Sequence, residues 1–330
     1  MNTKAIFGAF SLSAVMITGA MAEDFKPAVV FGDRNDLSYN EAAYKGALQF
    51  EERTGVKFRE FEIQNPPQRE QALRNFARRG MNPIITIGFA QAPALRRVAK
   101  EFPDTNFAII DAVVDLPNVR SIIFKEDEGS FLVGMLAAMA SKSDTIGFIG
   151  GMDLPLIRKF ACGYKQGAKY AKPDVTILEN MTGTTSAAWR DPLKGGKLAR
   201  SQFARGADVV FHAAGLTGTG VLQAAADDGK LGIGVDSNQN HLHPGSVLTS
   251  MTKGIDVAVE KTLTDAQDGN WTSGVEVLGL AENGVSWSYD QHNMPLITDE
   301  MKTALEKAKT DIISGRVEVH DYTVDPTCPF

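Results

Sequence analysis

The chain has 330 residues, of which 43% are hydrophobic and 22% are charged, and its formal net charge is −6. This composition is that of an ordinary globular protein. A mildly acidic chain without a basic cluster argues against nucleic acid and anionic membrane surfaces as partners.

Residues 1–22 have the pattern of a cleavable export signal. Lys4 supplies a positive charge, residues 5–19 are apolar and uncharged, and residues 20–22 (AMA) match the small-x-small cleavage site. The apolar stretch is too short to span a bilayer comfortably, which disfavours the alternative of a retained membrane anchor. Because no cysteine follows this stretch, we expect no lipid anchor. The sequence therefore predicts a soluble protein of the periplasm.

The mature chain of about 308 residues suits two domains of about 150 residues each. From residue 28 onward, short apolar runs alternate with helical stretches, which is typical of parallel sheets flanked by helices. The predicted strands are 28–32, 56–62, 83–88, 106–111, 120–124, 145–150, 175–180, 207–212, 231–236 and 246–251. The predicted helices include 40–54, 67–79, 128–141, 158–171, 218–229 and 253–267.

Three segments are interpreted as crossings between two lobes. The strand at 120–124 has no long helix before it, the segment from 246 looks like the return, and 276–289 looks like a third crossing. We therefore predict an α/β protein with two Rossmann-like lobes joined by three strands, followed by a final helix at 298–314. The expected limits are 23–121 plus 252–280 for lobe 1 and 122–251 plus 281–330 for lobe 2.

Candidate binding residues follow from the strand ends, because ligands of open parallel sheets bind just beyond the carboxyl ends of the strands. Aromatic rings, carboxylates, an amide, a lysine and small residues occur at these positions. The candidates are Asp36, Tyr39, Asn40, Phe89, Asp111, Trp189, Gly215, Asp236 and Lys253. Aromatic faces suit a planar ring, and carboxylates that accept from paired hydroxyls suit a sugar. We expect a mostly apolar pocket with a few oriented polar groups.

These residues also have structural explanations. Asp36 can simply cap the helix that follows it, and Asp111 and Asp236 stand where turns favour aspartate. Phe89 suits a hydrophobic core as well as a stacked ring. Lys253 opens a predicted helix, where the positive end of the helix dipole disfavours a lysine, so we expect it to have an acidic partner.

The sequence matches no complete motif for catalysis or metal binding. The segment 215–220 (GLTGTG) follows a strand and opens a helix, but Gln223 stands where the dinucleotide fingerprint has glycine. No Gly-x-Ser-x-Gly nucleophile elbow occurs. His241 and His243 are two residues apart and have no cysteine or third histidine nearby, which disfavours a metal site. We expect a binding protein without cofactor or metal, rather than an enzyme.

Cys162 and Cys328 are the two cysteines of the chain. An exported protein permits a disulfide, but the sequence leaves open whether the two residues pair or stay as buried free thiols.

A series of motifs resembles the basic membrane protein family of solute-binding proteins, whose best-known type is the purine nucleoside receptor of ABC importers. The matching segments run in order through nearly all of the mature chain and include DLSYNEAAYKG, EGSFLVGMLAAM, WRDPLKGGKLA, HAAGLTGTGV and TSMTKGIDVAV. The resemblance implies a type I periplasmic binding-protein fold, in which two lobes close over one ligand. It also implies delivery of that ligand to an ABC permease in the inner membrane.

The resemblance assigns a role to each candidate residue. It implies contacts with a base edge (Asp36, Asn40), a ring sandwich (Tyr39, Trp189), contacts with ribose hydroxyls (Asp236, Lys253) and the remaining cavity wall (Phe89, Asp111, Gly215). The chain departs from the family pattern at three positions. Phenylalanine is usual where this chain has Tyr39 and Trp189, and aspartate is usual at Asn238. These departures change the size and polarity expected for the pocket.

We therefore predict a monomeric periplasmic solute-binding protein of an ABC importer, which binds a purine nucleoside or a related base-containing molecule by hinge closure. The nearest alternative is a sugar or a signalling molecule as the ligand. A sensory or adhesion domain that uses the same cleft, and an exported enzyme acting on nucleosides or sugars, are the alternatives from other classes.

Overall fold

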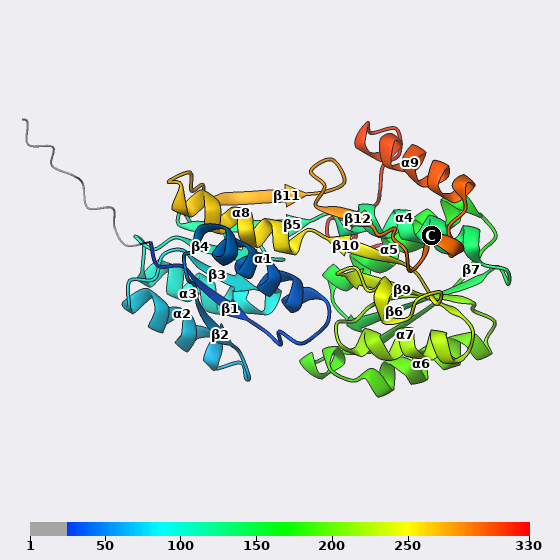
Figure 1. The fold of residues 1–330 in the computed structure, drawn as a ribbon, viewed down its shortest axis with the longest axis horizontal. Helices are drawn as coiled ribbons and strands as arrows, with labels where there is room; N and C mark the ends of the chain where they lie inside the picture. The colour runs from blue at the N-terminus through cyan, green and yellow to red at the C-terminus, as the bar shows by residue number, and fades with distance from the viewer. Residues whose placement is uncertain (1–24) are drawn as a thin grey trace, which may run out of the picture.

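The computed structural model describes residues 25–330 and shows two α/β lobes side by side (Figure 1). The predicted signal peptide lies outside the described residues. Each lobe contains one six-stranded sheet, and all strand pairs within the sheets are parallel except β10 with β12. Within residues 25–330, no helix combines the length and apolar character needed to cross a membrane.

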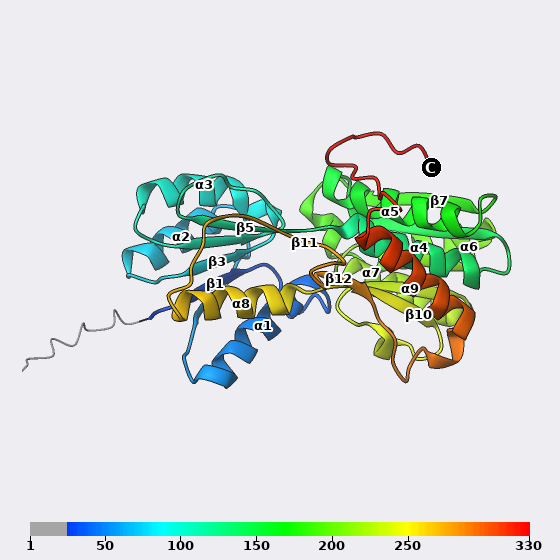
Figure 2. The same ribbon diagram turned by 90° about the horizontal axis from the view of Figure 1, so that it is seen from above.

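The first sheet has the strand order β11-β5-β4-β3-β1-β2. Its strands are β1 (Ala28–Phe31), β2 (Arg59–Glu62), β3 (Ile84–Ile87), β4 (Phe107–Ile110), β5 (Val119–Phe124) and β11 (Gly274–Leu278). Its helices are α1 (Tyr39–Thr54), α2 (Gln68–Arg78), α3 (Ala92–Glu101) and α8 (Ile255–Gln267). Helix α1 packs beside α8, and α2 packs beside α3 (Figure 2).

Strand β1 illustrates why these apolar runs become central strands. All four of its residues are buried, and their side chains alternate between the two faces of the sheet. Val29 and Phe31 join the core under α1 and α8, whereas Ala28 and Val30 join the core under α2 and α3. A strand covered on both faces is apolar along its whole length, which is the pattern that the sequence showed.

The second sheet has the order β12-β10-β9-β8-β6-β7. Its strands are β6 (Thr145–Met152), β7 (Thr176–Gly183), β8 (Val209–Ala213), β9 (Leu231–Asp236), β10 (Val247–Lys253) and β12 (Val285–Trp287). Helices α4 (Glu126–Ala140), α5 (Pro155–Ala171) and α9 (Asp299–Ile313) share the main core with one face of this sheet. Helices α6 (Pro192–Ala204) and α7 (Thr217–Asp227) cover the other face.

The chain passes between the sheets three times, from β5 into α4, from β10 into α8, and from β11 into β12. Each passage adjoins strands that extend from the two sheets toward each other (Figure 1). This is the predicted type I periplasmic binding-protein architecture with its three-strand hinge. The changes of sheet fall next to Lys125, Gly254 and residues 279–284. Residues 252 and 253 end β10 in the second lobe and residues 122–124 end β5 in the first, whereas the predicted limits placed each of these pieces in the other lobe.

Helix α4 begins at Glu126, two residues before its predicted start. The reason is electrostatic, because acidic residues are stabilised by the positive end of the helix dipole. The first turn contains Glu126, Asp127 and Glu128, and all of these side chains are buried. The two cysteines are paired: a disulfide joins Cys162 on α5 to Cys328 near the C-terminus.

Candidate ligand-binding cleft

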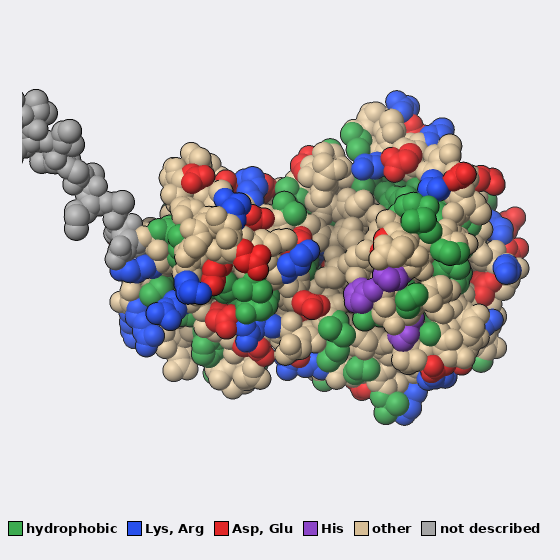
Figure 3. Space-filling model, viewed as in Figure 1, with side chains coloured by type: hydrophobic (Ala, Val, Ile, Leu, Met, Phe, Trp, Pro, Cys, Tyr) green, Lys and Arg blue, Asp and Glu red, His purple; other side chains and the backbone are tan. Residues whose placement is uncertain are grey.

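A cavity of about 630 Å³ lies between the two lobes, and all the candidate binding residues named from the sequence line it. The first lobe supplies Asp36, Tyr39, Asn40, Phe89 and Asp111, and the second lobe supplies Trp189, Gly215, Asp236 and Lys253. The space-filling view shows the surface hollowed between the lobes (Figure 3). The carboxyl ends of both sheets face this cavity, which is why residues from distant parts of the chain meet there.

Two aromatic residues, Tyr39 and Trp189, line the cavity wall. Tyr39 opens α1, and Trp189 ends the short 3₁₀ helix η2 (Ser186–Trp189). The indole of Trp189 packs directly on Gly151, where a Cβ atom would lie 2.1 Å from the ring. Gly215 adopts φ +55° beside the Trp189 backbone, a conformation that glycine reaches without strain. Trp189 therefore packs against the backbone of Gly151 and Gly215, neither of which has a side chain.

Lys253 is buried in the wall of the cavity and has the acidic partners that its position predicted. Its Nζ donates to both carboxylate oxygens of Asp111, at 2.9 and 2.7 Å, and to Glu126 at 3.0 Å. Burial alone would lower the pKa of Lys253, but Asp111, Glu126 and Asp236 raise it above its usual value. The ring of Tyr39 lies 5.2 Å from the ammonium group. The cavity thus contains a fully charged lysine whose donors already have acceptors.

Glu126 was missed in the sequence analysis. Its side chain is 1% exposed, and it contacts Lys253 from the first turn of α4. The signal was present in the run KEDEG, because an acidic cluster directly after an apolar strand marks a helix start. What the run did not indicate is that this helix start is buried at the hinge.

Asp36 caps helix α1, as the structural alternative proposed. Its carboxylate accepts from the backbone N–H groups of Ser38, Asn40 and Glu41 at 3.0–3.2 Å. It also accepts from the Asn40 amide at 2.8 Å, and the Asn40 Oδ1 accepts from the backbone N–H of Gly32 at 2.8 Å. Asp36 and Asn40 line the cavity while forming these bonds. Of the two, the Asn40 amide retains a free donor hydrogen for a ligand.

Asp236 lies in the cavity wall and has an acceptor without a partner among the described residues. Its Oδ2 accepts from the Ser38 hydroxyl across the lobes at 3.0 Å, whereas its Oδ1 is buried without a hydrogen-bond partner among residues 25–330. Burial raises the pKa of Asp236 to about 7, with Lys253 opposing the shift and Asp111 adding to it. A buried polar atom without a partner is costly, so it is a natural place for a ligand hydroxyl or amine.

The backbone of the two central aspartates is unusual. Both Asp111, directly after β4, and Asp236, the last residue of β9, adopt φ +65°. Non-glycine residues in this region carry strain, and they gather at functional sites where neighbouring structure holds them in place. Asp111 lies in a bend and Asp236 ends β9, and both residues line the cavity.

The two lobes touch beside the cavity. Apart from the Ser38–Asp236 bond, the Ser237 hydroxyl donates to the Ser38 carbonyl at 2.9 Å, and the Gln239 amide donates to the Leu37 carbonyl at 2.9 Å. At the opening, Arg190 and Asp33 form an ion pair across the lobes at 3.4 Å. Within residues 25–330, no group of three or more His, Cys, Asp or Glu side chains is placed to hold a metal ion.

A two-lobed α/β fold with a three-strand hinge and a cavity between the lobes is the architecture of type I solute-binding proteins. A solved ABC transporter solute-binding protein from Aeropyrum pernix K1 superimposes with a TM-score of 0.82 and 28% identity, covering 90% of this chain and 93% of that chain. A transcriptional activator of the comK gene from Bacillus halodurans shares the fold, with a TM-score of 0.76 and 22% identity, over 90% of this chain and all of the other.

The chain belongs to the Bmp family, described as ABC transporter substrate-binding protein PnrA-like, which matches residues 27–323. The ABC transporter nucleoside-binding protein BmpA of Lactococcus lactis subsp. cremoris is 32% identical, covering 96% of this chain and 95% of the relative. An uncharacterized lipoprotein of Pyrococcus horikoshii is 36% identical over 81% of this chain and 70% of its own length. The protein is thus an ABC transporter substrate-binding protein, from a family that binds solutes rather than converting them.

Proposed function

We propose that this protein binds a purine nucleoside or a related base-containing molecule in the cavity between its lobes and delivers it to an ABC permease. The observation that carries this proposal is the meeting, in one cavity, of two aromatic rings and a buried acceptor: Tyr39, Trp189 and Asp236. Rings suit a planar base, and the acceptor suits a hydroxyl or an amine. The name of the Lactococcus relative, a nucleoside-binding protein, supports the same ligand class.

Different residues of the cavity would contact the base and the ribose. Tyr39 and Trp189 would hold the base, with the Asn40 amide at its edge. Asp236 would accept from ribose hydroxyls. Because every donor of Lys253 faces a carboxylate, we propose that Lys253 and Asp111 act there as a pair. A ribose hydroxyl would then donate to a lone pair of Asp111 that the lysine leaves open.

Binding would favour hinge closure. The cavity is lined from both lobes, so a ligand makes all its contacts only when the lobes are together. A ligand with more contacts in the closed form shifts the population toward that form. The permease would then recognise the closed form, and no covalent bond of the ligand would change.

Calorimetric titration and thermal shift tests decide the ligand class. Guanosine, inosine and adenosine should each be compared with adenine, ribose and glucose. A ligand at about 100 times its dissociation constant adds about 2.7 kcal/mol to the free energy of unfolding. A shift with glucose or ribose and none with any nucleoside would reject the nucleoside proposal in favour of a sugar. Recovery of the nucleoside unaltered after incubation is expected, and its hydrolysis would instead support an enzyme.

We also propose that residues 1–22 are removed on export and that the mature protein is a soluble periplasmic monomer. Some relatives are named lipoproteins, so this point needs its own test. Mass spectrometry of the protein from the periplasmic fraction should give a chain that begins at Glu23 without an acyl group. Recovery of an acylated chain in the membrane fraction would contradict the proposal.

A further inference from the structure

A chain of buried ion pairs leads from the cavity to helix α5. Lys253, in the cavity, contacts Oε1 of Glu126 at 3.0 Å. The other oxygen of Glu126 lies 3.3 Å from Nζ of Lys159 on α5. Both lysines and Glu126 have side chains that are 6% exposed or less. Glu126 is therefore shared between a lysine that lines the cavity and a lysine that does not.

Lys159 contacts several acidic and polar groups at the first passage between the lobes. Its Nζ donates to the carbonyl of Phe124, the last residue of β5, at 2.9 Å. It also lies 3.4 Å from Asp127 and 3.4 Å from Asp321. Burial alone would lower the pKa of Lys159, but Glu126, Asp127 and Asp321 raise it above its usual value. One cation thus balances carboxylates from two different segments of the chain.

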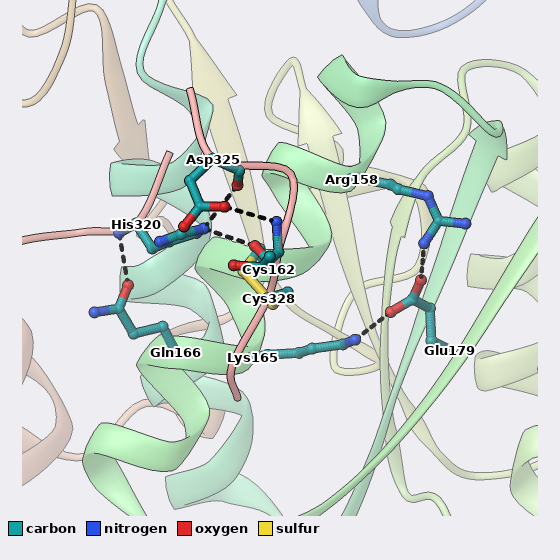
Figure 4. The surroundings of a disulfide bond; sticks show 9 residues. Arg158, Cys162, Lys165, Gln166, Glu179, His320, Asp325 and Cys328 are labelled. Atoms are coloured by element: carbon teal, nitrogen blue, oxygen red, sulfur yellow. Dashed lines mark hydrogen bonds and ion pairs between the residues drawn. A yellow bond between two sulfur atoms is a disulfide. The ribbon is translucent and has the colours of Figure 1, made fainter. Parts of the chain in front are cut away.

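The segment that supplies Asp321 is the C-terminal tail, residues 317–330. The disulfide fastens this tail to α5, and Figure 4 shows the tail passing over the helix at Cys162. The Gln166 side chain adds two bonds: its Oε1 accepts from the His320 backbone N–H at 2.9 Å, and its Nε2 donates to the Glu318 carbonyl at 2.9 Å.

The tail follows one face of the helix. Lys159, Cys162 and Gln166 are spaced by three and four residues, so they lie along a single face of α5. The tail is anchored at two of these positions and contacts the third through Asp321.

The same helix also lines the cavity. Phe160, next to Lys159 in sequence, is a lining residue, and its ring lies 5.8 Å from Nζ of Lys253. Helix α5 therefore connects the tail, the hinge and the cavity. Buried ion pairs that exclude water interact strongly, whereas water that reaches one of the charged groups weakens the ion pairs of that group.

We propose that Lys159 is a positioning residue for ligand binding and that the disulfide-fastened tail keeps it in place. Lys159 holds Glu126, Glu126 holds Lys253, and Lys253 holds Asp111 in the cavity. Release of the tail exposes Lys159 to water and weakens this series of contacts. Ligand affinity then depends on the Cys162–Cys328 bond, although neither cysteine lines the cavity. This inference rests on the proposed function in one respect: the affinity measurements need a nucleoside that binds.

The test compares variants of the tail with matched controls. Asp321→Asn and the double variant C162A/C328S should bind guanosine, inosine or adenosine about 3- to 10-fold more weakly than the wild type, which is a common range for coupled sites. Asp321→Glu should restore the affinity, which a loss of general stability would not allow. Asp325→Asn makes the same chemical change four residues along the tail, where no ion pair forms with the described residues, and should bind like the wild type.

A second pair of variants tests the helix itself. Lys159→Met should weaken binding by about tenfold or more, since it leaves Asp127 buried without a cation and leaves Glu126 with Lys253 alone. Lys165→Met is the control on the same helix. Lys165 forms its ion pair with Glu179 at 2.5 Å on the side of α5 away from the tail (Figure 4). If Lys159→Met does not fold, Asp321→Asn still decides, because Asp321 is 32% exposed.

Hydrogen exchange of the ligand-free protein separates this inference from the proposed function. Residues 107–113 and 250–256, which contain Asp111 and Lys253, should exchange faster in Asp321→Asn than in Asp325→Asn. If the wild type binds no nucleoside, the proposed function fails and the exchange rates alone decide the inference. Equal exchange in the two variants, or equal affinity where a nucleoside binds, overturns the positioning role of Lys159.

Discussion

Lys253 and Asp111 form a doubly hydrogen-bonded ion pair although they come from different sheets. Asp111 follows β4 in the first lobe, and Lys253 ends β10 in the second lobe. The two residues are 142 positions apart in the chain, and their side chains are 5% and 1% exposed. This pair joins the lobes in the wall of the cavity.

Lys253→Met should destabilise the protein by about 3–5 kcal/mol, because Asp111 would be left buried without its cation and Glu126 would keep only Lys159. Urea unfolding measures this free energy. Lys45→Met is the matched control, since Lys45 pairs with Asp256 at 3.0 Å while 63% exposed. An exposed pair contributes less than about 1 kcal/mol. Equal losses in the two variants would contradict the importance assigned to the Lys253 pair.

Trp189→Ala should reduce nucleoside affinity by about 1–3 kcal/mol, the usual contribution of a stacked base. Trp189→Phe should recover most of the loss, because a phenyl ring still offers a flat face. Calorimetric titration with guanosine measures both. An alanine variant that binds as tightly as the wild type would exclude a stacking role.

Gly151→Ala should weaken nucleoside binding by displacing Trp189, although the added methyl group would not itself contact the ligand. Its Cβ would lie 2.1 Å from the indole of Trp189, so the ring would have to move, at a cost of about 1–3 kcal/mol. Gly183→Ala is the control, because its Cβ would meet Ala188 at an ordinary 3.5 Å. Guanosine titration of the two variants separates displacement of the indole from the general effect of an added methyl group.

Asp236 should make the protein less stable as the pH rises from about 4 to about 7. Its pKa is about 7 in the folded state, above that of an unfolded aspartate, so the folded state binds more protons in this range. Its contribution to stability is therefore complete at low pH and is lost as the pH rises through about 7.

Asp236→Asn isolates this effect, since other groups titrate in the same range. The pKa of His212 is lowered to about 4 by burial, which acts in the opposite direction. The difference in unfolding free energy between the wild type and the variant should change by up to about 1.4 kcal/mol per pH unit. Urea unfolding at pH 5.0, 6.0 and 7.0 gives this difference, and a value independent of pH would contradict the raised pKa.

Much of the cavity was predictable from one rule about parallel sheets. Strand ends such as Asp111 and Asp236 could be located from apolar runs alone, and the rule places them at a common edge. The family resemblance then assigned roles, of which those of Asp36 and Asn40 compete with helix capping. Capping is a local interaction, so the sequence indicated it as well, but only the hydrogen bonds show that the Asp36 carboxylate is fully used.

The sequence by itself determined the layered α/β fold, the two lobes and nine residues of the cavity wall, because strand periodicity and strand ends are local properties. Tertiary structure alone decided which charges pair: Lys253 with Asp111 and Glu126, and Lys159 with the tail. It also decided that the cysteines meet across 166 residues. Such contacts depend on how two lobes and a terminal segment approach each other in space, and no spacing along the chain encodes that approach.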